Sequence, residues 1–167
     1  YNVLGYKVTQ AMKAKVVPGR MIGWYEFFLI NRTIESTILE HKAVRRISRG
    51  LPQGTVISPY AWNLIMDSLL ELVNDGIGVG VAFADDLVCL IAGHDLGSLV
   101  LCMQKKVNSA IKWSITNGLQ LSEEKTEYCV FQKTGTHSPS SKHTLTMIGS
   151  PIKQVKCVKY LGITFTY

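Results

Sequence analysis

The 167-residue sequence contains no apolar run close to the roughly 20 residues that cross a bilayer, which argues against a membrane-spanning helix. It also lacks a cationic start followed by an apolar stretch, the pattern of a secretory signal. These absences predict an intracellular protein with no membrane partner. No Met precedes the opening YNVLGYK, which already has a structured pattern, so we expect the polypeptide to begin earlier.

Cysteine is scarce, and the four cysteines lie far apart, with no Cys-x-x-Cys or His spacing that would make a zinc site. Three of them lie in apolar or strand-like runs and are predicted to be buried, reduced thiols. The four histidines are also scattered, and no nucleophile or partner acid accompanies them at a recognisable spacing. The sequence therefore assigns them no catalytic role. The cysteines are Cys89, Cys102, Cys129 and Cys157.

Acidic residues are outnumbered, with 12 Asp and Glu against 18 Lys and Arg, which gives a net charge of +6. This balance suits contact with a polyanion, but an ordinary basic protein has it too. With 47% hydrophobic residues the chain can bury one sizeable core, so we expect one compact domain.

The first half of the chain alternates helical and strand patterns. Apolar residues spaced three and four apart predict helices over residues 6–17 and 20–30, separated by a Pro-Gly pair. Two β-rich runs, TIESTIL and AVRRIS, predict a hairpin. The loop RGLPQGTVISP then leads into a helix predicted from Tyr60 to Asn74, whose broad apolar face indicates burial.

The second half begins with VGVAF and LVCLIA, which flank two acids and predict strands covered on both faces. Asp95 is expected to cap a helix that continues to about Thr116. LQLS and KTEYCVF predict further strands, residues 133–143 a mobile loop, and residues 144–167 more strands. The whole pattern predicts an α+β fold with antiparallel strands packed against helices.

Asp85 and Asp86 are adjacent acids inside an otherwise apolar run, GVAFADDLVCL. Two neighbouring carboxylates repel and a buried one is costly, so the pair needs cations, protons or solvent. A divalent metal such as Mg²⁺ meets this need, because it prefers carboxylate and phosphate oxygens and retains waters. A solvated turn explains the same two residues, so the pair alone does not decide between these interpretations.

The loop GLPQGTVISP contains two prolines and two glycines, which have opposite effects on the freedom of the backbone. Pro52 and Pro59 restrict the backbone, whereas Gly50 and Gly54 allow the backbone to approach a ligand closely. Gln53 adds an amide that can donate and accept hydrogen bonds. An ordinary loop before a core helix would have the same composition, so the loop indicates a site only through its position before the acidic hairpin.

Five segments in order resemble those of reverse transcriptases, and within that family those of non-LTR (LINE-like) retrotransposons. The resemblance covers nearly the whole chain, and PQG-x-x-x-SP followed by FADD is its most specific part. The segments are VVPGRMIGWYEFFLINRT, GLPQGTVISPYAWNLIMDSL, FADD, GLQLSEEKTEYCVF and VKYLGITF.

This resemblance implies a polymerase palm-type antiparallel sheet packed on helices, with part of the fingers and the start of the primer-grip region. Residues 1–167 would form a partial reverse transcriptase domain, with 1–132 in fingers and palm and 144–167 in primer-grip strands. It also implies an RNA-directed DNA polymerase that acts in retrotransposition. Its partners would be an RNA template, a DNA primer and dNTPs, in the nucleus and cytoplasm, with an endonuclease domain elsewhere in the polypeptide.

By the same resemblance, Asp85 would be the principal ligand of two Mg²⁺ ions, which Mn²⁺ could replace, and Asp86 would support it. Two such metals act on the attacking and leaving oxygens of nucleotidyl transfer. Lys125 would protonate or neutralise the pyrophosphate leaving group. Its alternative role is a solvated lysine beside two glutamates.

Other residues match the family's nucleic-acid contacts. Phe83 would pack beside the primer end, although a role only in the core is the alternative. The residues that would lie against the template and the incoming nucleotide are Pro52, Gln53 and Gly54, and those that would grip the primer strand are Tyr160, Leu161 and Gly162.

Four arginines surround the predicted β-hairpin and could contact phosphates: Arg32, Arg45, Arg46 and Arg49. Arg49 is the one nearest to the loop that would bind template and nucleotide. Arg45 and Arg46 alternate sides of a strand and cannot both face one ligand.

One part of the family pattern has no match here, the strand D-x-x-x-A-F/Y that carries another essential Asp. Tyr1 could be the last residue of that motif, the aromatic that excludes the ribose 2′-hydroxyl. With only part of the acidic set, the chain by itself is expected to be inactive. A catalytically inactive retroelement remnant that still binds nucleic acid is therefore the alternative, and a maturase or viral RNA-copying enzyme of the same design is a third possibility.

Overall fold

The computed structural model describes residues 3–131 and 144–166, so the predictions for Tyr1 and for the whole loop 133–143 lie outside the described residues. Helices and small, mostly antiparallel two-stranded sheets alternate along the described chain. The predicted α+β class is therefore confirmed. None of the described helices is both long and apolar enough to cross a membrane.

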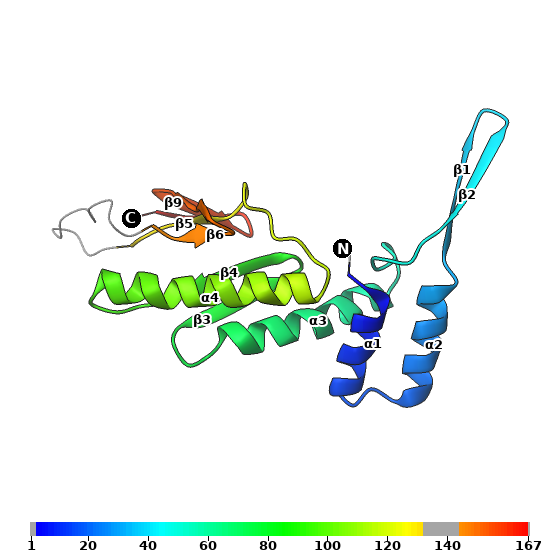
Figure 1. The fold of residues 1–167 in the computed structure, drawn as a ribbon, viewed down its shortest axis with the longest axis horizontal. Coiled ribbons are helices and arrows are strands. Elements are labelled where there is room, and N and C mark those ends of the chain that lie inside the picture. The colour runs from blue at the N-terminus through cyan, green and yellow to red at the C-terminus, as the bar shows by residue number, and fades with distance from the viewer. Residues whose placement is uncertain (1–2, 132–143, 167) are drawn as a thin grey trace.

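The first two helices, α1 (Gly5–Ala14) and α2 (Gly19–Ile30), lie side by side and are separated at Pro18 (Figure 1). The proline cannot continue a preceding helix but fits the start of the next one, which explains why the predicted break is observed. One face of each helix is buried, because its apolar residues recur every three or four positions. The buried apolar residues are Val8, Met12, Ile22, Tyr25 and Leu29.

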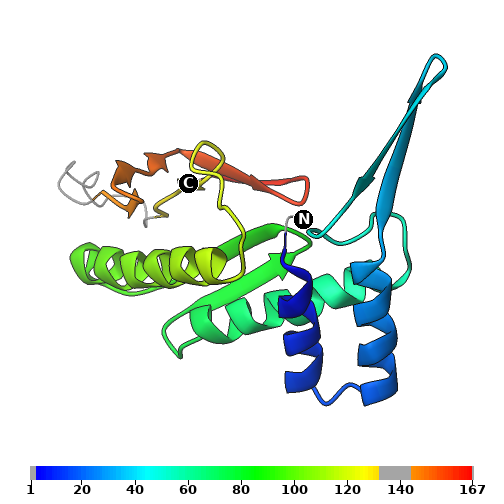
Figure 2. The same ribbon diagram turned by 45° about the vertical axis from the view of Figure 1, so that its right-hand side comes forward.

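A hairpin of β1 (Thr33–Ile38) and β2 (His41–Arg46) follows α2, as predicted. Every residue in both strands is exposed. Figures 1 and 2 show the hairpin projecting away from the rest of the molecule. Its side chains therefore add nothing to the core of the described domain.

Helix α3 (Ile57–Val73) is the centre of the core. Ala61, Ile65, Leu69 and Val73, spaced four apart, are each at most 2% exposed. The helix begins at Ile57 and not at the predicted Tyr60, because Pro59 occupies the first turn, where its missing N–H costs no hydrogen bond. Residues from the segment before α1, from α1, α2 and α4, and from the loop before α3 complete this core, including Val3, Val8, Met12, Tyr25, Leu29, Leu51, Ala110 and Trp113.

The acidic hairpin consists of β3 (Val79–Phe83) and β4 (Asp86–Leu90). Its inner face packs against the core through Ala82, Leu87 and Cys89. The prediction that both faces are covered is wrong: outer-face residues are 45% to 61% exposed, because within the described residues the core lies against one face only. These residues are Val79, Val81, Phe83 and Leu90.

Gly80 brings β3 into close contact with the end of α3. A Cβ atom at this position would lie 2.3 Å from Cγ2 of Val73. The Asn74 side chain pairs with Gly80 like a strand neighbour, because its Oδ1 accepts from the Gly80 N–H (2.7 Å) and its Nδ2 donates to the Gly80 carbonyl (3.1 Å). The acidic hairpin is thereby fixed to α3 at the end remote from the acids.

Helix α4 (Leu96–Thr116) has the predicted limits, and the Asp95 carboxylate caps it by accepting the Ser98 N–H at 2.8 Å. A small second core lies between α4 and the C-terminal strands, which Figure 2 shows above the helix. LQLS forms no strand. The C-terminal pairs are β5 (Glu127–Tyr128) with β8 (Lys153–Gln154), β6 (Thr146–Met147) with β7 (Ser150–Pro151), and β9 (Cys157–Tyr160) with β10 (Ile163–Thr166).

All four cysteines are free, as predicted, but they are less buried than expected, with Cys157 exposed and the others half-buried. Burial raises the pKa of the Cys89 and Cys129 thiols. Both thiols therefore favour the protonated, unreactive form.

A buried lysine joins α4 to the end of α3. Lys106 is 3% exposed, and its Nζ donates to the Asp75 carboxylate and to the Val73 carbonyl, each at 2.5 Å. Asp75 itself remains about half exposed. The sequence did not reveal this pair, because a lysine on a helix normally indicates a solvated face.

We expect this pair to make the protein less stable in acid. The hydrogen bond from Lys106 lowers the pKa of Asp75 below its ordinary value of 3.8. A lowered pKa in the folded state stabilises the protein above the unfolded-state pKa, and this contribution is lost as pH falls through the folded-state pKa. Chemical denaturation across acidic pH should therefore show a shallower loss of stability for Asp75→Asn than for the wild type.

The matched control is Glu26→Gln, an exposed acid on α2 that forms no ion pair with any residue of the described ranges. Its pH profile should follow that of the wild type. Parallel profiles for Asp75→Asn and the wild type would mean that the Asp75–Lys106 contact is absent in solution.

Candidate active site

The β3–β4 turn presents the two acids to solvent. Phe83 pairs with Asp86 across the strands, so the turn consists of Ala84 and Asp85, with Ala84 at a positive φ of 52°. Both Asp side chains are exposed, although the run around them is apolar. Since solvent reaches the carboxylates, neither bears the cost of burial, and both can be reached by a ligand.

Trp62 of α3 holds this turn in place. Its indole N–H donates to the Ala84 carbonyl at 2.6 Å, and its side chain is 5% exposed. Trp62 lies in the second turn of α3, just after the loop that contains Pro52, Gln53 and Gly54. The acidic turn is therefore attached to the helix that this loop introduces, which brings together two segments that the sequence indicated separately.

The loop before α3 is held at both ends by hydrogen bonds. At its start, Arg32 donates to the Gly50 carbonyl at 2.7 Å, and the Gly50 N–H donates to the Val3 carbonyl at 2.8 Å. At its end, the Thr55 hydroxyl lies 3.2 Å from the Pro52 carbonyl. Between these anchors Gln53 and Gly54 are exposed, and Gly54 has a φ of 81° that favours glycine.

The Arg32 guanidinium thus binds the backbone of the loop. Its Nε also donates to the Leu29 carbonyl, at 3.1 Å. The sequence grouped it with three other arginines as a possible phosphate contact, but its guanidinium is engaged by carbonyl groups and is only partly exposed. It is best described as a support of the loop.

Tyr25 of α2 belongs to the same buried core as Leu51 of this loop, and its hydroxyl has no hydrogen-bond partner among the described residues. Burial raises the pKa of the Tyr25 phenol above its ordinary value of 10.0, whereas Ser58 and Arg32 act in the opposite direction. An unpaired buried hydroxyl is destabilising because it has lost its water.

Replacing Tyr25 with Phe should therefore increase the free energy of unfolding by about 1 kcal/mol, because it removes the unpaired hydroxyl and keeps the ring. Urea denaturation measures the change. Tyr6→Phe, at a tyrosine that is 60% exposed, is the matched control and should have almost no effect. A loss of stability in Tyr25→Phe would show instead that the hydroxyl is hydrogen-bonded in solution, with Ser58 as the nearest candidate.

The remaining predicted site residues are spread over several elements. Phe83 lies on the same face of the hairpin as Asp86 and is 61% exposed, so a purely core role does not apply. Lys125 is exposed in the segment before β5, and no contact recorded for residues 3–131 or 144–166 joins it to Asp85 or Asp86. Arg49 is exposed and forms a backbone bridge with Leu4.

Tyr160, Leu161 and Gly162 form the corner of the β9–β10 hairpin. Tyr160 pairs with Ile163, and the turn residues Leu161 and Gly162 have φ of 48° and 83°, as a type I′ turn requires. Leu161 is 52% exposed at this tip. Glycine is needed at the second turn position because other side chains rarely adopt its backbone conformation.

The described residues contain no group of three or more His, Cys, Asp or Glu side chains placed to hold a metal. Asp85 and Asp86 still suit Mg²⁺, because this ion is commonly bound by one or two carboxylates together with waters and substrate phosphates. They are exposed oxygen donors at the tip of one hairpin, and oxygen is the donor type that Mg²⁺ requires.

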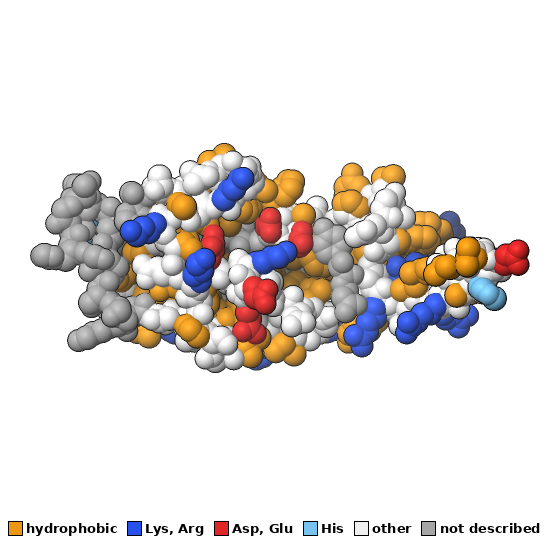
Figure 3. Space-filling view, turned by 90° about the horizontal axis from the view of Figure 1, so that it is seen from above, with side chains coloured by type: hydrophobic (Ala, Val, Ile, Leu, Met, Phe, Trp, Pro, Cys, Tyr) orange, Lys and Arg blue, Asp and Glu red, His pale blue; other side chains and the backbone are white. Residues whose placement is uncertain are grey.

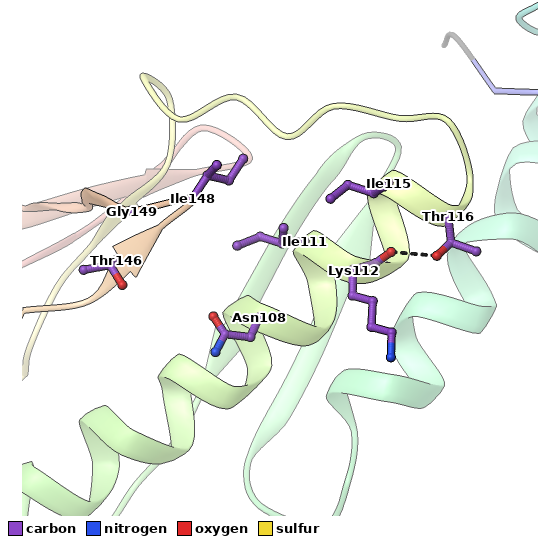
Figure 4. Close-up of a pocket in the computed structure, with 8 residues that line it drawn as sticks. All are labelled: Asn108, Ile111, Lys112, Ile115, Thr116, Thr146, Ile148 and Gly149. Atoms are coloured by element: carbon purple, nitrogen blue, oxygen red, sulfur yellow. Dashed lines mark hydrogen bonds between the residues drawn. The ribbon is translucent and has the colours of Figure 1, made fainter.

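A shallow pocket elsewhere contains none of the predicted site residues. It lies between α4 and the β6–β7 hairpin (Figure 4). Within the helix, the Thr116 hydroxyl donates to the Lys112 backbone carbonyl at 2.8 Å. The lining residues are Asn108, Ile111, Lys112, Ile115, Thr116, Thr146, Ile148 and Gly149.

Comparison with known proteins yields a consistent set of relatives. A family model described as reverse transcriptase (RNA-dependent DNA polymerase) matches residues 5–165. The chain is 34% identical over 122 residues to a Retrovirus-related Pol polyprotein from type-1 retrotransposable element R1 2 of Nasonia vitripennis, covering 70% of this chain and 29% of that protein. It is 33% identical over 136 residues to the corresponding polyprotein from type-2 retrotransposable element R2DM of Drosophila melanogaster, covering 71% and 12%. The chain thus spans less than a third of the length of these relatives.

Proposed function

The chain belongs to the reverse transcriptase family, and on this premise we propose that it carries the catalytic carboxylates of an RNA-directed DNA polymerase. The observation that carries the proposal is the acidic turn: Asp85 and Asp86 are exposed on a hairpin that Trp62 anchors to the helix following the Pro52–Gly54 loop. The polypeptide that contains the chain would extend a DNA primer on an RNA template with dNTPs, as part of the retrotransposition of a non-LTR element. Its relatives are encoded by the R1 and R2 elements.

In this proposal Asp85 is the principal ligand of the catalytic Mg²⁺ ions and Asp86 supports it, with Mn²⁺ as a possible replacement. The metal ions would stabilise negative charge on the attacking and leaving oxygens of nucleotidyl transfer. Trp62 keeps the acids in position by holding the turn backbone. Lys125 would neutralise or protonate the pyrophosphate, for which its exposed ammonium leaves it free to move.

The loop residues Pro52, Gln53 and Gly54 would contact the template and the incoming nucleotide. Two observations support these contacts: Gln53 is exposed, and the exposed Gly54 has no side chain that would keep a ligand from its backbone. The loop that carries both residues is fixed at its start and its end by hydrogen bonds. Phe83, exposed beside Asp86, would pack against the primer end. Arg49 would bind a phosphate nearby, and Tyr1 would exclude the ribose 2′-hydroxyl.

The likeness to the family also suggests which polymerase regions the parts of the chain form. We propose that residues 1–132 form parts of the fingers and palm, and that residues 144–167 begin the primer grip, with Tyr160, Leu161 and Gly162 at its tip. The exposed tip at Leu161 suits contact with a nucleic-acid strand. An endonuclease domain would lie in another part of the polypeptide, since the relatives are much longer than this chain.

Primer extension tests the function directly. The polypeptide that contains this chain is incubated with an RNA template, an annealed DNA primer, dNTPs and Mg²⁺. The expected product is DNA whose length depends on the template and whose synthesis requires the metal. A polypeptide that folds and binds RNA but makes no product under these conditions would contradict the proposal.

The alternative is a catalytically inactive remnant that binds nucleic acid. The observation that favours it is the lack, among residues 3–131 and 144–166, of a third acid beside Asp85 and Asp86. Reading the DNA upstream of the Tyr1 codon separates the two. An open frame that ends in Asp-x-x-x-Ala favours the enzyme, whereas a stop codon or frameshift favours the remnant.

A further inference from the structure

The β1–β2 hairpin is built for contact with another molecule. All twelve of its strand residues are exposed, and it is a sheet of two strands alone. A solitary two-stranded hairpin is at best marginally stable in water. Exposed apolar side chains on the hairpin lower its stability in water further. They include Ile34, Ile38, Leu39 and Val44, which are 56% to 91% exposed.

The hairpin also carries a concentration of positive charge. The segment from Arg32 to Arg49 contains five basic and two acidic residues, which accounts for half of the net charge of +6 of the whole chain. Figure 3 shows Lys and Arg side chains in a row along one edge of the projecting hairpin, with apolar side chains along the other. The basic edge is β2, because β1 contains no lysine or arginine.

Three arginines, two on β2 and one after its end, are free to bind. Lys42 is engaged with Glu35 at 2.8 Å, and Arg32 binds backbone carbonyls. In contrast, Arg45, Arg46 and Arg49 are exposed and form no ion pair with any described residue. A group of unpaired guanidinium groups favours phosphate, which they bind through paired N–H donors.

The strand register determines the faces of β2 on which its arginines lie, and so the kind of ligand that can contact both. Arg45 is paired with Ile34 and Arg46 with Thr33, so the two side chains leave β2 on opposite faces. A ligand resting on one face would reach only one of them. A strand of nucleic acid that follows the edge of β2 can be contacted from both sides, and the chain itself runs on from β2 through Arg49 to the loop at Pro52.

We propose that the β2 edge, through Arg45 and Arg46 and on to Arg49, binds the sugar–phosphate backbone of single-stranded RNA and leads it toward the Gln53 loop. This assigns the hairpin a template-guiding role that rests on the proposed polymerase function. Recognition is by charge, so it is independent of base sequence. The acidic tip, with Glu40, limits the contact to the base of the hairpin.

The experiment measures binding of fluorescent single-stranded RNA to the 167-residue chain at several salt concentrations, without Mg²⁺ or nucleotide. The Arg45→Gln/Arg46→Gln variant should bind more weakly at low salt, by the same factor for different RNA sequences. The slope of log K against log salt should fall by about 1.4, because each lost phosphate contact on a single strand removes about 0.7. Folding should be unchanged, since both side chains are exposed.

Arg20→Gln is the matched control, because Arg20 is an exposed arginine at the opposite end of α2 and forms no described ion pair. The assay contains neither Mg²⁺ nor nucleotide, so failure of the catalytic proposal leaves this test intact. Equal slopes for the double variant and Arg20→Gln would overturn the proposal. So would a change confined to duplex RNA, or a change in oligomeric state that identifies the hairpin as a contact between copies of the chain.

Discussion

Replacing Asp85 with Asn should reduce primer extension by about a thousandfold, which corresponds to about 4 kcal/mol of transition-state stabilisation. The amide keeps the shape of the side chain but removes the charge that would hold the metal. Stability should hardly change, because Asp85 is exposed in a turn whose backbone contact comes from Ala84. Single-turnover extension, together with thermal unfolding, separates the loss of chemistry from a loss of folding.

The acid-to-amide control Glu26→Gln should retain full activity, since Glu26 is exposed on α2. Asp86→Asn should give a smaller defect than Asp85→Asn, because its proposed role is support. Undiminished synthesis by Asp85→Asn would remove Asp85 from the metal site. Equal losses in Glu26→Gln and Asp85→Asn would point to a general effect on the protein.

Replacing Gly80 with Ala should destabilise the domain by about 3 kcal/mol, the upper part of the usual range for overpacking a core. The added Cβ would lie 2.3 Å from Cγ2 and 3.3 Å from Cβ of Val73, a fully buried and β-branched side chain that cannot rotate freely. The hairpin would have to move away from α3, which also weakens both hydrogen bonds to Asn74. Urea denaturation measures the change, and primer extension should fall with it, because the same hairpin carries Asp85.

A second substitution, at Val73, tests whether a steric clash causes the loss of stability in Gly80→Ala. Val73→Ala alone should destabilise by about 2 kcal/mol, but combined with Gly80→Ala it removes the methyl groups that clash. The double variant should therefore be more stable than the sum of the single effects predicts. Gly23→Ala is the control, since no atom lies within 4 Å of a Cβ there and the position is inside α2, where Ala is favoured over Gly by up to about 1 kcal/mol. Additive losses in the double variant would contradict the clash.

Local signals predicted much of the secondary structure. Pro18 separates α1 from α2, and Asp95 caps α4. These predictions held because a cap or a break depends on a few neighbouring residues. The start of α3 was missed because a first-turn proline looks the same in sequence as a loop proline.

For the candidate site, the sequence predicted some residues and gave no sign of others. Asp85, Asp86 and the Pro52–Gly54 loop were predicted as site residues from residue type and order, and the family match extends over residues 5–165. The contact of Trp62 with the acidic turn was not predicted. Trp62 lies in a segment where the sequence indicated only a helix with a broad apolar face, and nothing in that pattern indicated a hydrogen bond to a carbonyl 22 positions later.

The family, the order of the helices and hairpins, and the identity of the acids follow from residues close together in the chain, because caps, turns and motifs are short-range features. Three features required the folded chain: the anchoring of the acidic turn by Trp62, the contact of Gly80 with Val73, and the exposure of the outer face of β3 and β4. Each depends on which face of one element meets a distant one. Periodicity shows that a face is apolar, but only packing decides whether another element covers it.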